Sequence, residues 1–491
     1  MRERLNLEKG TAILLSKGGQ AGTIQELDIM RILLLTPEHP SQDPEGRGSP
    51  VGRDVEGLAR AYRAAGHDVR VAVPCYRTAS SQGWQAVASL RVSFLRCAES
   101  EVRTTPKWPG VRMICHPLLE RSHPYLDENG WDHADNALRF AVYGASAMLD
   151  CAADGWFPDL VHGHEWQSGL GVLYASDHLA EHLRHPRLLF TFQDAAFQGL
   201  CDASWIKDIG LGPEWLTTER IEFWGRLNLL KAGLVCAHHC TTPSRHYLDA
   251  LLADHHGYGL EGLFRTLTNT HRVTPVTPGV DTTFWSLPEG TCDSVASLMA
   301  WKAARKLELV DGDEPLLVFA SAFRPGKGID HVLTLLPDIL KMNVRVGMVG
   351  GQGTEARRHL EGIAEAHPRK IILFNKGDET LKHVLAAADF LLLPVTHQPG
   401  GVLYARAMAM GTPALAHRMG AVADQVVPHP KPNCDGFLFD DLAPDVLLKQ
   451  LRKVIHQVGN RADWGEICLR AARRDFSWDS VARIYLDIAE V

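Results

Sequence analysis

Short apolar runs alternate with longer amphipathic stretches along most of the chain. The runs Ile32–Leu35 and Val69–Val73 enclose the stretch Val55–Ala65, in which apolar residues recur at helical spacing. Strands and helices alternate in this way when parallel β-sheets are covered by helices on both faces. Six further strand-like runs are Leu160–His162, Leu188–Phe192, Leu316–Ala320, Val344–Val349, Ile371–Phe374 and Phe390–Leu393.

The alternation occurs twice, which predicts an α/β protein with two doubly wound, Rossmann-like domains facing each other across a cleft. A chain of 491 residues is also too long for a single core. An irregular interval rich in Thr, Pro and Gly, near Thr274–Gly290, separates the two series, and Ser477-Trp478 opens a last amphipathic helix. The predicted parts are a weakly ordered extension (1–29), a first domain (30–277), a second domain (278–476) and a terminal helix (477–491).

Composition and charge narrow the class of protein. The net charge of −7 gives no reason to expect a nucleic acid or a membrane as partner. No apolar run approaches the eighteen or so residues of a membrane-spanning helix, and the patch Ala12–Leu15 is too short for the core of a signal peptide. The ten cysteines show no paired spacing, and Cys236 and Cys240 fit a zinc or redox motif poorly. We therefore expect a cytoplasmic protein with reduced thiols and without a metal or cofactor.

The segment Pro394–Gly411, PVTHQPGGVLYARAMAMG, carries the clearest chemistry. It follows the apolar run Phe390–Leu393 and leads into a helical spacing of Leu403, Ala407 and Met410. The turn at Pro399-Gly400-Gly401 would expose backbone N–H groups at the start of that helix. Such donors, at the positive end of the helix dipole, suit a phosphate or a polar sugar.

This segment resembles the donor-sugar loop of the bacterial glycogen/starch synthase family, P-S-x-x-E-P-C-G-L. The resemblance extends over most of residues 31–490. The other matching motifs are TFQDAAFQG (191–199), VHGHEWQSGL (161–170), KAGLVCAHHCTTPS (231–244), YGLEGL (258–263), PGVDTTFW (278–285), SAFRPGKG (321–328) and MGAVADQV (419–426). The resemblance implies a GT-B fold with a C-terminal helix that returns to the first domain. It also implies glucosyl transfer, with retention, from ADP-glucose to the non-reducing end of an α-1,4-glucan such as glycogen.

The diphosphate leaving group of that reaction needs cations, because negative charge develops on it as the bond breaks. Of the three cations that the family places there, the resemblance retains Lys327. The family's arginine is replaced by Ala322, and its N-terminal lysine by Gly48. Arg324 lies two positions after Ala322 and is a substitute donor, although a different Cα origin makes the same fork geometry doubtful.

Two sugar-contacting positions also differ from the family pattern. Gln193 stands in place of a histidine and Gln398 in place of a glutamate. A glutamine side chain cannot carry a proton, and it lacks the charge that stabilises an oxocarbenium-like transition state. By resemblance, the catalytic positions are Lys327, Gln398 and Gln193. The donor-binding positions are Lys327, Arg324, Pro399, Gly400, Gly401, Val402, Gly48 and Gly52, and the acceptor or cleft positions are His164, Glu165, Trp166, Tyr258, Glu261 and Asp281.

The sequence leaves three functions open. Each lost electrostatic contact is worth roughly 3–4 kcal/mol, so four changed positions predict a loss of roughly 10⁴-fold or more. The chain is therefore an impaired glucosyltransferase or a pseudoenzyme that binds glucan or nucleotide in a regulatory or scaffolding role. A transferase for another nucleotide sugar is the third possibility. The alternation of His162 and His164 beside Glu165 suggests a metal only weakly, because no third ligand is suitably spaced.

Overall fold

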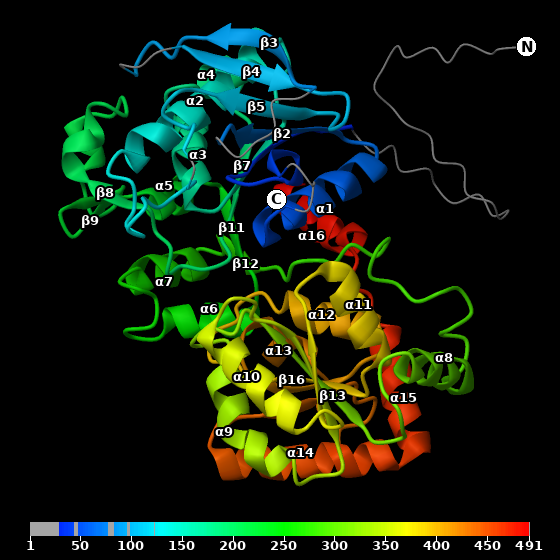
Figure 1. Cartoon of the computed structure of the whole chain (residues 1–491). Coiled ribbons are helices and arrows are strands. Elements are labelled where there is room, and N and C mark those ends of the chain that lie inside the picture. The colour runs from blue at the N-terminus through cyan, green and yellow to red at the C-terminus, as the bar shows by residue number, and fades with distance from the viewer. Residues whose placement is uncertain (1–28, 44–47, 77–82, 96–98, 122, 491) are drawn as a thin grey trace, which may run out of the picture. The chain divides into compact units, whose positions relative to one another are not determined.

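The computed structural model describes residues 29–490 except for 44–47, 77–82, 96–98 and 122. The predicted extension 1–29 lies, apart from Ile29, outside the described residues. The chain divides into two compact units (Figure 1). Unit 1 comprises 1–241, 257–274 and 482–491, and unit 2 comprises 242–256 and 275–481.

Unit 1 is built on a nine-stranded sheet with the strand order β12-β11-β7-β6-β1-β2-β5-β4-β3. The central strands pair in parallel, from β7 through β6, β1 and β2 to β5. A small antiparallel sheet, β8-β10-β9, accompanies it. The strands are β1 (Arg31–Leu35), β2 (Asp68–Pro74), β3 (Gln85–Leu90), β4 (Ser100–Thr104), β5 (Val111–Cys115), β6 (Leu160–His164), β7 (Arg187–Thr191), β8 (Leu200–Asp202), β9 (Glu222–Phe223), β10 (Arg226–Asn228), β11 (His239–Thr242) and β12 (Val273–Pro275).

Helices cover the unit 1 sheet, and the longest of them, α2, is almost wholly buried. The helices are α1 (Pro50–Ala64), α2 (Asn136–Ala153), α3 (Gly169–Ser176), α4 (Ala180–Leu183), α5 (Leu229–Cys236) and α7 (Glu261–Asn269), with the short 3₁₀ helices η1 (Pro40–Gln42), η2 (Trp166–Ser168), η3 (Ala203–Ile206) and η4 (Pro213–Trp215). The terminal helix α16 (Trp478–Glu490) begins in unit 2 and continues into unit 1.

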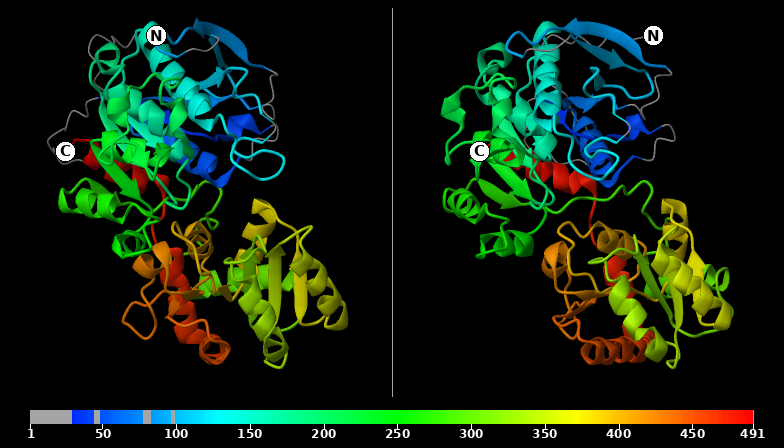
Figure 2. Two further views of the ribbon diagram at one scale, coloured as in Figure 1. Left: turned by 90° about the vertical axis from the view of Figure 1, so that its left-hand side faces the viewer. Right: turned by 60° about the vertical axis from the view of Figure 1, so that its left-hand side comes forward.

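Unit 2 contains a six-stranded, all-parallel sheet with helices on both faces (Figure 2). Its strands follow the order β15-β14-β13-β16-β17-β18. They are β13 (Leu316–Ser321), β14 (Arg345–Gly350), β15 (Ile371–Phe374), β16 (Phe390–Leu393), β17 (Ala414–His417) and β18 (Phe437–Phe439). The helices are α6 (Arg245–Leu252), α8 (Val295–Leu307), α9 (Ile329–Ile339), α10 (Glu355–Ala366), α11 (Asp378–Ala387), α12 (Val402–Ala409), α13 (Gly420–Gln425), α14 (Pro444–Gly459) and α15 (Arg461–Ala472).

Strand β13 shows why the strands of unit 2 are continuous runs of hydrophobic residues rather than alternating hydrophobic and polar residues. Leu317 and Phe319 belong to one hydrophobic cluster, whereas Leu316, Val318 and Ala320 belong to a second. Successive side chains of a strand point to opposite faces of the sheet, so both faces of β13 must be apolar. The two clusters are the two layers of core on either side of the sheet.

The apolar runs predicted as strands are confirmed as β1, β2, β6, β7, β13, β14, β15 and β16. The predicted helices after Gly401 and Ser477 are confirmed as α12 and α16. The predicted parallel, doubly wound sheets are confirmed, and an antiparallel edge extends the sheet of unit 1, where β4 pairs antiparallel with both β3 and β5. The strands β3, β4 and β5 are neighbours both in sequence and in the sheet. Within the described part of the chain, no helix combines the length and apolar character needed to cross a membrane.

Candidate active site

Two loops at the carboxyl ends of adjacent strands of unit 2 lie against each other. The first, Ser321–Gly328, follows β13, and the second, Pro394–Gly401, follows β16; these strands pair in parallel. The Thr396 backbone N–H and hydroxyl both donate to the carbonyl of Gly326, each at 3.2 Å. A Cβ at Gly328 would approach the Pro394 carbonyl oxygen to 2.8 Å. The position of each loop is therefore set by the other.

Lys327 joins the same two loops through its side chain. Its Nζ donates a hydrogen bond of 3.0 Å to the carbonyl oxygen of His397, the residue before Gln398. The ammonium group is exposed at this position. Lys327, the cation predicted from the sequence, therefore lies against the predicted donor loop. Its ammonium group donates one hydrogen bond to the backbone of that loop.

The predicted loop around Gln398 also rests on the start of α13. A Cβ at Gly420 would meet the Gln398 carbonyl oxygen at 2.0 Å, and Gly420 has a φ of 53°. The Ala421 N–H donates to the Pro399 carbonyl at 2.9 Å. No residue with a side chain fits at position 420 without moving this loop.

The helices α9 and α12 both begin at these loops with a left-handed glycine. Gly328 (φ 84°) precedes α9 and Gly401 (φ 63°) precedes α12, and neither helix receives a side-chain cap at its N-terminus. First-turn N–H groups without a side-chain partner, together with the helix dipole, form a partial positive charge. Along with Lys327, they give these loops the character of an anion-binding surface.

The other family position in the first loop, Ala322, is exposed, as is Arg324. Between them, Phe323 is buried with a φ of 52° and stacks on Phe319, with 5.7 Å between ring centroids. Gly351, which follows β14, makes room for this ring, because a Cβ there would lie 1.9 Å from it. Because the buried Phe323 lies between them, the Cα atoms of Ala322 and Arg324 occupy different places along the loop.

In unit 1, the end of β6 carries a buried chain of polar groups. His162 Nε2 lies 2.7 Å from the Thr191 hydroxyl, which lies 2.6 Å from the Thr241 hydroxyl. The His162 ring is 4.1 Å from that of His164 and 5.0 Å from that of Tyr485 in α16. Burial lowers the pKa of His164 to about 3 and that of His162 well below its usual value. Both imidazoles are therefore neutral near pH 7.

Glu165 is the residue that links this cluster to Gln193. Its carboxylate accepts the Gln193 backbone N–H at 3.0 Å, and its own N–H donates to the Thr191 carbonyl at 2.9 Å. Its φ of 64° and ψ of 166° are strained for a residue with a side chain. Burial raises the pKa of Glu165 to about 8, against the opposing hydrogen bond from Gln193.

Trp166 and Tyr258 lie next to the loop that contains Gln193. A Cβ at Gly199 would lie 2.2 Å from the Trp166 ring, so the indole packs directly on that backbone. The Gln198 side chain donates to the Tyr258 carbonyl at 3.0 Å. The Glu261 carboxylate accepts the Gly257 N–H at 3.0 Å, which places Glu261 in a structural role at the start of α7.

Exposed aromatic side chains near Tyr258 were not predicted from the sequence. Phe197, Trp224 and Tyr258 are 64%, 84% and 44% exposed. Phe197 precedes Gln198, and Trp224 lies 3.5 Å from the position of a Cβ on Gly259. Trp224 forms, with Gly225, the tip of the β9–β10 hairpin, at a φ of 51°. Apolar periodicity gives no signal for a single aromatic residue at a hairpin tip.

The predicted Gly48 and Gly52 pack against the loop that follows β1. A Cβ at Gly48 (φ 62°) would lie 2.9 Å from the Pro40 Cα, and a Cβ at Gly52 would lie 2.8 Å from the His39 Cα. Close packing against this loop therefore accounts for the presence of glycine at both positions. Their predicted contact with the donor stays a prediction.

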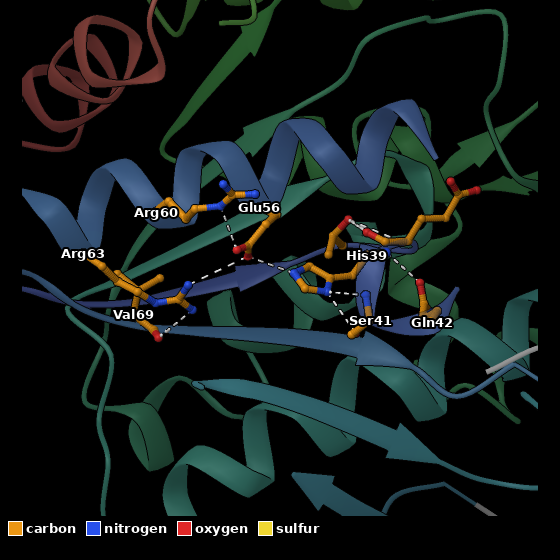
Figure 3. Close-up of polar contacts among 9 residues, drawn as sticks. His39, Ser41, Gln42, Glu56, Arg60, Arg63 and Val69 are labelled. Carbon is orange, nitrogen blue, oxygen red and sulfur yellow. Dashed lines mark hydrogen bonds and ion pairs between the residues drawn. The ribbon is translucent and has the colours of Figure 1, made fainter. Parts of the chain in front are cut away.

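A buried ion pair under this loop was also missed by the sequence analysis (Figure 3). His39 Nε2 lies 3.0 Å from the Glu56 carboxylate in α1, which Arg60 and Arg63 also approach, at 3.1 and 3.8 Å. Burial raises the pKa of Glu56, but the His39 hydrogen bond and these positive charges outweigh it and lower the pKa. The network fixes the loop after β1 onto α1.

Two further predictions concern Asp281 and metals. The Asp281 carboxylate accepts the N–H and hydroxyl of Thr283, at 3.0 and 2.5 Å, in a turn of unit 2. Among the residues that the structure describes, no cluster of three or more His, Cys, Asp or Glu side chains is arranged to hold a metal ion.

The predicted residues thus fall into two groups. His164, Glu165, Trp166, Gln193, Tyr258 and Glu261, with Gly48 and Gly52, belong to unit 1. Arg324, Lys327, Gln398, Pro399, Gly400, Gly401, Val402 and Asp281 belong to unit 2. Within each unit, contacts between loops join most members, whereas Asp281 and the pair of Gly48 and Gly52 lie in separate local structures.

Comparison with known proteins agrees with this division. A model of the starch synthase catalytic domain matches residues 33–266, and one of group 1 glycosyl transferases matches residues 302–468. The catalytic domain of starch synthase IV from Arabidopsis thaliana, in a structure bound to ADP and acarbose, aligns with a TM-score of 0.78 at 21% identity, covering 94% of this chain and 99% of that one. Sucrose-phosphate synthase from Thermosynechococcus elongatus aligns with a TM-score of 0.58 at 16% identity, covering 94% and 98%. The two Rossmann-like units define a GT-B glycosyltransferase fold.

Full-length relatives narrow the class further. A glycogen synthase of Deinococcus deserti is 33% identical over 480 residues, covering 94% of this chain and 99% of that protein. A glycogen synthase of Paramagnetospirillum magneticum is 31% identical over 466 residues, covering 89% and 93%. The chain belongs to the glycogen/starch synthase family of glycosyltransferases.

Proposed function

We propose that this protein transfers glucosyl units from ADP-glucose to the non-reducing end of an α-glucan such as glycogen, at a strongly reduced rate. Lys327 carries the proposal, because its ammonium group donates a hydrogen bond to the donor loop. The two loops that it joins lead into α9 and α12, which both begin without side-chain caps. A diphosphate is stabilised by this combination of one ammonium and several N–H donors.

The reduced rate follows from the neutral side chains at three of the other positions that the family resemblance assigns to the site. Ala322 and Gln398 supply no charge in unit 2, and Gln193 supplies none in unit 1. The carboxyl group that accepts the Gln193 backbone N–H belongs to Glu165, and burial disfavours its charged form. We expect a loss of roughly 10⁴-fold or more relative to a fully charged site.

The glucan is the better-supported ligand of the two. Sugar rings stack on aromatic faces, and the surface of unit 1 exposes the aromatic side chains of Phe197, Trp224 and Tyr258. None of these contacts depends on the charges that the donor side lacks. The pseudoenzyme alternative rests on the same observation, because a protein could keep this surface and lose transfer altogether.

The test is to incubate the purified protein with glycogen and labelled ADP-glucose and to count label in the polymer. UDP-glucose and GDP-glucose in parallel reactions distinguish the third possibility, a different donor. We expect the wild-type protein to transfer glucose slowly from ADP-glucose. We expect the Lys327→Ala variant to show no transfer. Transfer from another nucleotide sugar alone would contradict the donor assignment. Absence of transfer from all three, with glycogen still bound, would establish the pseudoenzyme.

A further inference from the structure

Cys75 and Cys115 lie opposite each other where two parallel strands of unit 1 end. Strand β5 ends at Cys115, and Cys75 directly follows β2. The register pairs Pro74 with Ile114, and the Cys75 N–H donates to the Ile114 carbonyl at 2.8 Å. The next opposed pair is therefore Cys75 with Cys115. Neighbouring strands are about 4.8 Å apart, which lies within the range of roughly 4.4–6.8 Å between the Cα atoms of a disulfide.

The two thiols affect each other's pKa, and they are not equivalent. The hydrogen bond from the Cys115 thiol lowers the pKa of Cys75, and the Arg103 guanidinium adds to this effect against the opposing burial. The same hydrogen bond, together with burial, raises the pKa of Cys115. Cys75 is thus the thiol that ionises first, and Cys115 keeps its proton.

Other cysteines of the described chain lie in a different environment. Burial raises the pKa of Cys151, Cys240 and Cys468 to about 12. These three are at most 1% exposed, whereas Cys75 is 8% exposed. Because the thiolate is the nucleophile, Cys75 should react before any of these three.

We propose that Cys75 and Cys115 form a redox-sensitive pair that a small peroxide converts into a disulfide. The Cys75 thiolate attacks one oxygen of hydrogen peroxide, the O–O bond breaks, and the released hydroxide takes a proton to leave as water. Cys75 is then a sulfenic acid. The Cys115 sulfur attacks the Cys75 sulfur; the S–S bond forms, the S–O bond breaks, and the Cys115 proton leaves with hydroxide as a second water. Two thiols lose two electrons, which reduce one peroxide.

This pair is independent of the proposed glucosyl transfer and was not predicted from the sequence. The two cysteines are 40 positions apart in the sequence, so no short sequence motif identifies them as a pair. They become neighbours only because β2 and β5 are adjacent in the sheet.

The pair can be tested by treating the full-length protein with a few equivalents of hydrogen peroxide. The remaining thiols are then alkylated in denaturant, and the digest is analysed by mass spectrometry. We expect a Cys75–Cys115 cross-linked peptide, reversed by a dithiol reductant, to appear before Cys151 is oxidised. In Cys115→Ser, Cys75 should stop at the sulfenic acid and be trapped by dimedone.

Cys151→Ser is the matched control, because it removes a buried thiol elsewhere in unit 1 and should leave the cross-link unchanged. Should Cys115→Ser not fold, the order of alkylation of the wild-type thiols without peroxide gives a second reading, with Cys75 expected to react at least tenfold faster than Cys151. The proposal is overturned if Cys75 oxidises no faster than Cys151, or if its disulfide partner is Cys97 instead of Cys115.

Discussion

Glu165 combines burial, backbone strain and two hydrogen bonds at a single position after β6. The strained φ of 64° directs its carboxylate to the Gln193 N–H, and its own N–H is bonded to Thr191. Conformations of this kind cost about 1–3 kcal/mol and persist where the surroundings enforce them. The residue therefore fixes the loop that carries Gln193, at the expense of burying an ionisable group.

Because the carboxyl group of Glu165 is buried, the stability of the folded protein should depend on pH. Its pKa of about 8 in the folded protein exceeds the ordinary value of 4.5, so its contribution is fully present below about pH 4.5 and is lost as the pH rises through 8. We expect Glu165→Gln, which does not titrate, to gain on the order of a few kcal/mol relative to wild type between about pH 5 and about pH 9. Urea unfolding of both proteins across this range measures the difference. A constant difference would contradict the raised pKa.

Substitution of Lys327 should weaken donor binding and leave glucan binding nearly unchanged. Lys327→Ala removes the ammonium group next to the His397 carbonyl, so ADP-glucose affinity should fall about tenfold or more. Affinity for maltooligosaccharides should stay within about twofold, because ring stacking and hydroxyl contacts do not use this charge. Calorimetry with both ligands provides the measurement. Lys341→Ala, which removes an exposed lysine paired with Asp338, is the control and should change neither affinity.

At the scale of elements, unit 2 positions its candidate site by close backbone contact between loops. Gly328 faces the Pro394 carbonyl, and Gly420 faces that of Gln398. Loops that touch through main-chain atoms have little freedom to move separately. The donor loop is thus held by β13, β16 and α13 together.

A methyl group at Gly420 should displace the donor loop. Gly420→Ala puts a Cβ 2.0 Å from the Gln398 oxygen at a φ of 53°, which should cost roughly 1–3 kcal/mol of stability and weaken ADP-glucose binding. The control is Gly362→Ala in α10, where a Cβ meets nothing within 4 Å. That change should stabilise by roughly 0.5–1 kcal/mol. Thermal unfolding and calorimetry compare the two, and equal effects would argue against a fixed loop.

The sequence predicted β1, β2, β6, β7, β13, β14, β15 and β16 because their apolar runs must cover both faces of a sheet, and it missed β5, β11, β12, β17 and β18. It did not predict β3, β4 or the β8-β10-β9 sheet, whose short half-exposed strands lack such runs. Lys327 and the donor loop were predicted from motifs, and the Lys327–His397 contact agrees with that grouping. The His39–Glu56 pair and Trp224 were missed because tertiary contacts define the first and a hairpin tip defines the second.

At the scale of the whole molecule, the chain passes between its two units more than once. The first passages enclose residues 242–256, which include α6, and the last occurs within α16 at residue 481. The boundaries that the sequence predicts, at residues 278 and 477, stay predictions. The ends of the chain thus contribute to the same unit, with Tyr485 packed on His162.

Tyr485 should stabilise unit 1 specifically. It is buried, it contacts His162, and its hydroxyl is hydrogen-bonded to Thr191 and Thr241. Tyr485→Ala should cost roughly 3–5 kcal/mol, whereas Tyr485→Phe loses only the hydroxyl contacts, about 1 kcal/mol. Amide hydrogen exchange should show lower protection of β6, β7 and β11 in the alanine variant, with β13 and β16 unchanged. Equal loss of protection in both units would contradict this assignment.

We propose that this family member transfers glucose slowly because its donor site lacks charged side chains. The most direct test restores two charges in the variant Ala322→Arg with Gln398→Glu and compares its rate of transfer from labelled ADP-glucose to glycogen with that of the wild type. Ala322 is exposed and Gln398 is partly exposed, so both new side chains have room. We expect the transfer rate of this variant to be about tenfold higher or more. An unchanged rate in a variant that folds and binds glycogen normally would contradict it.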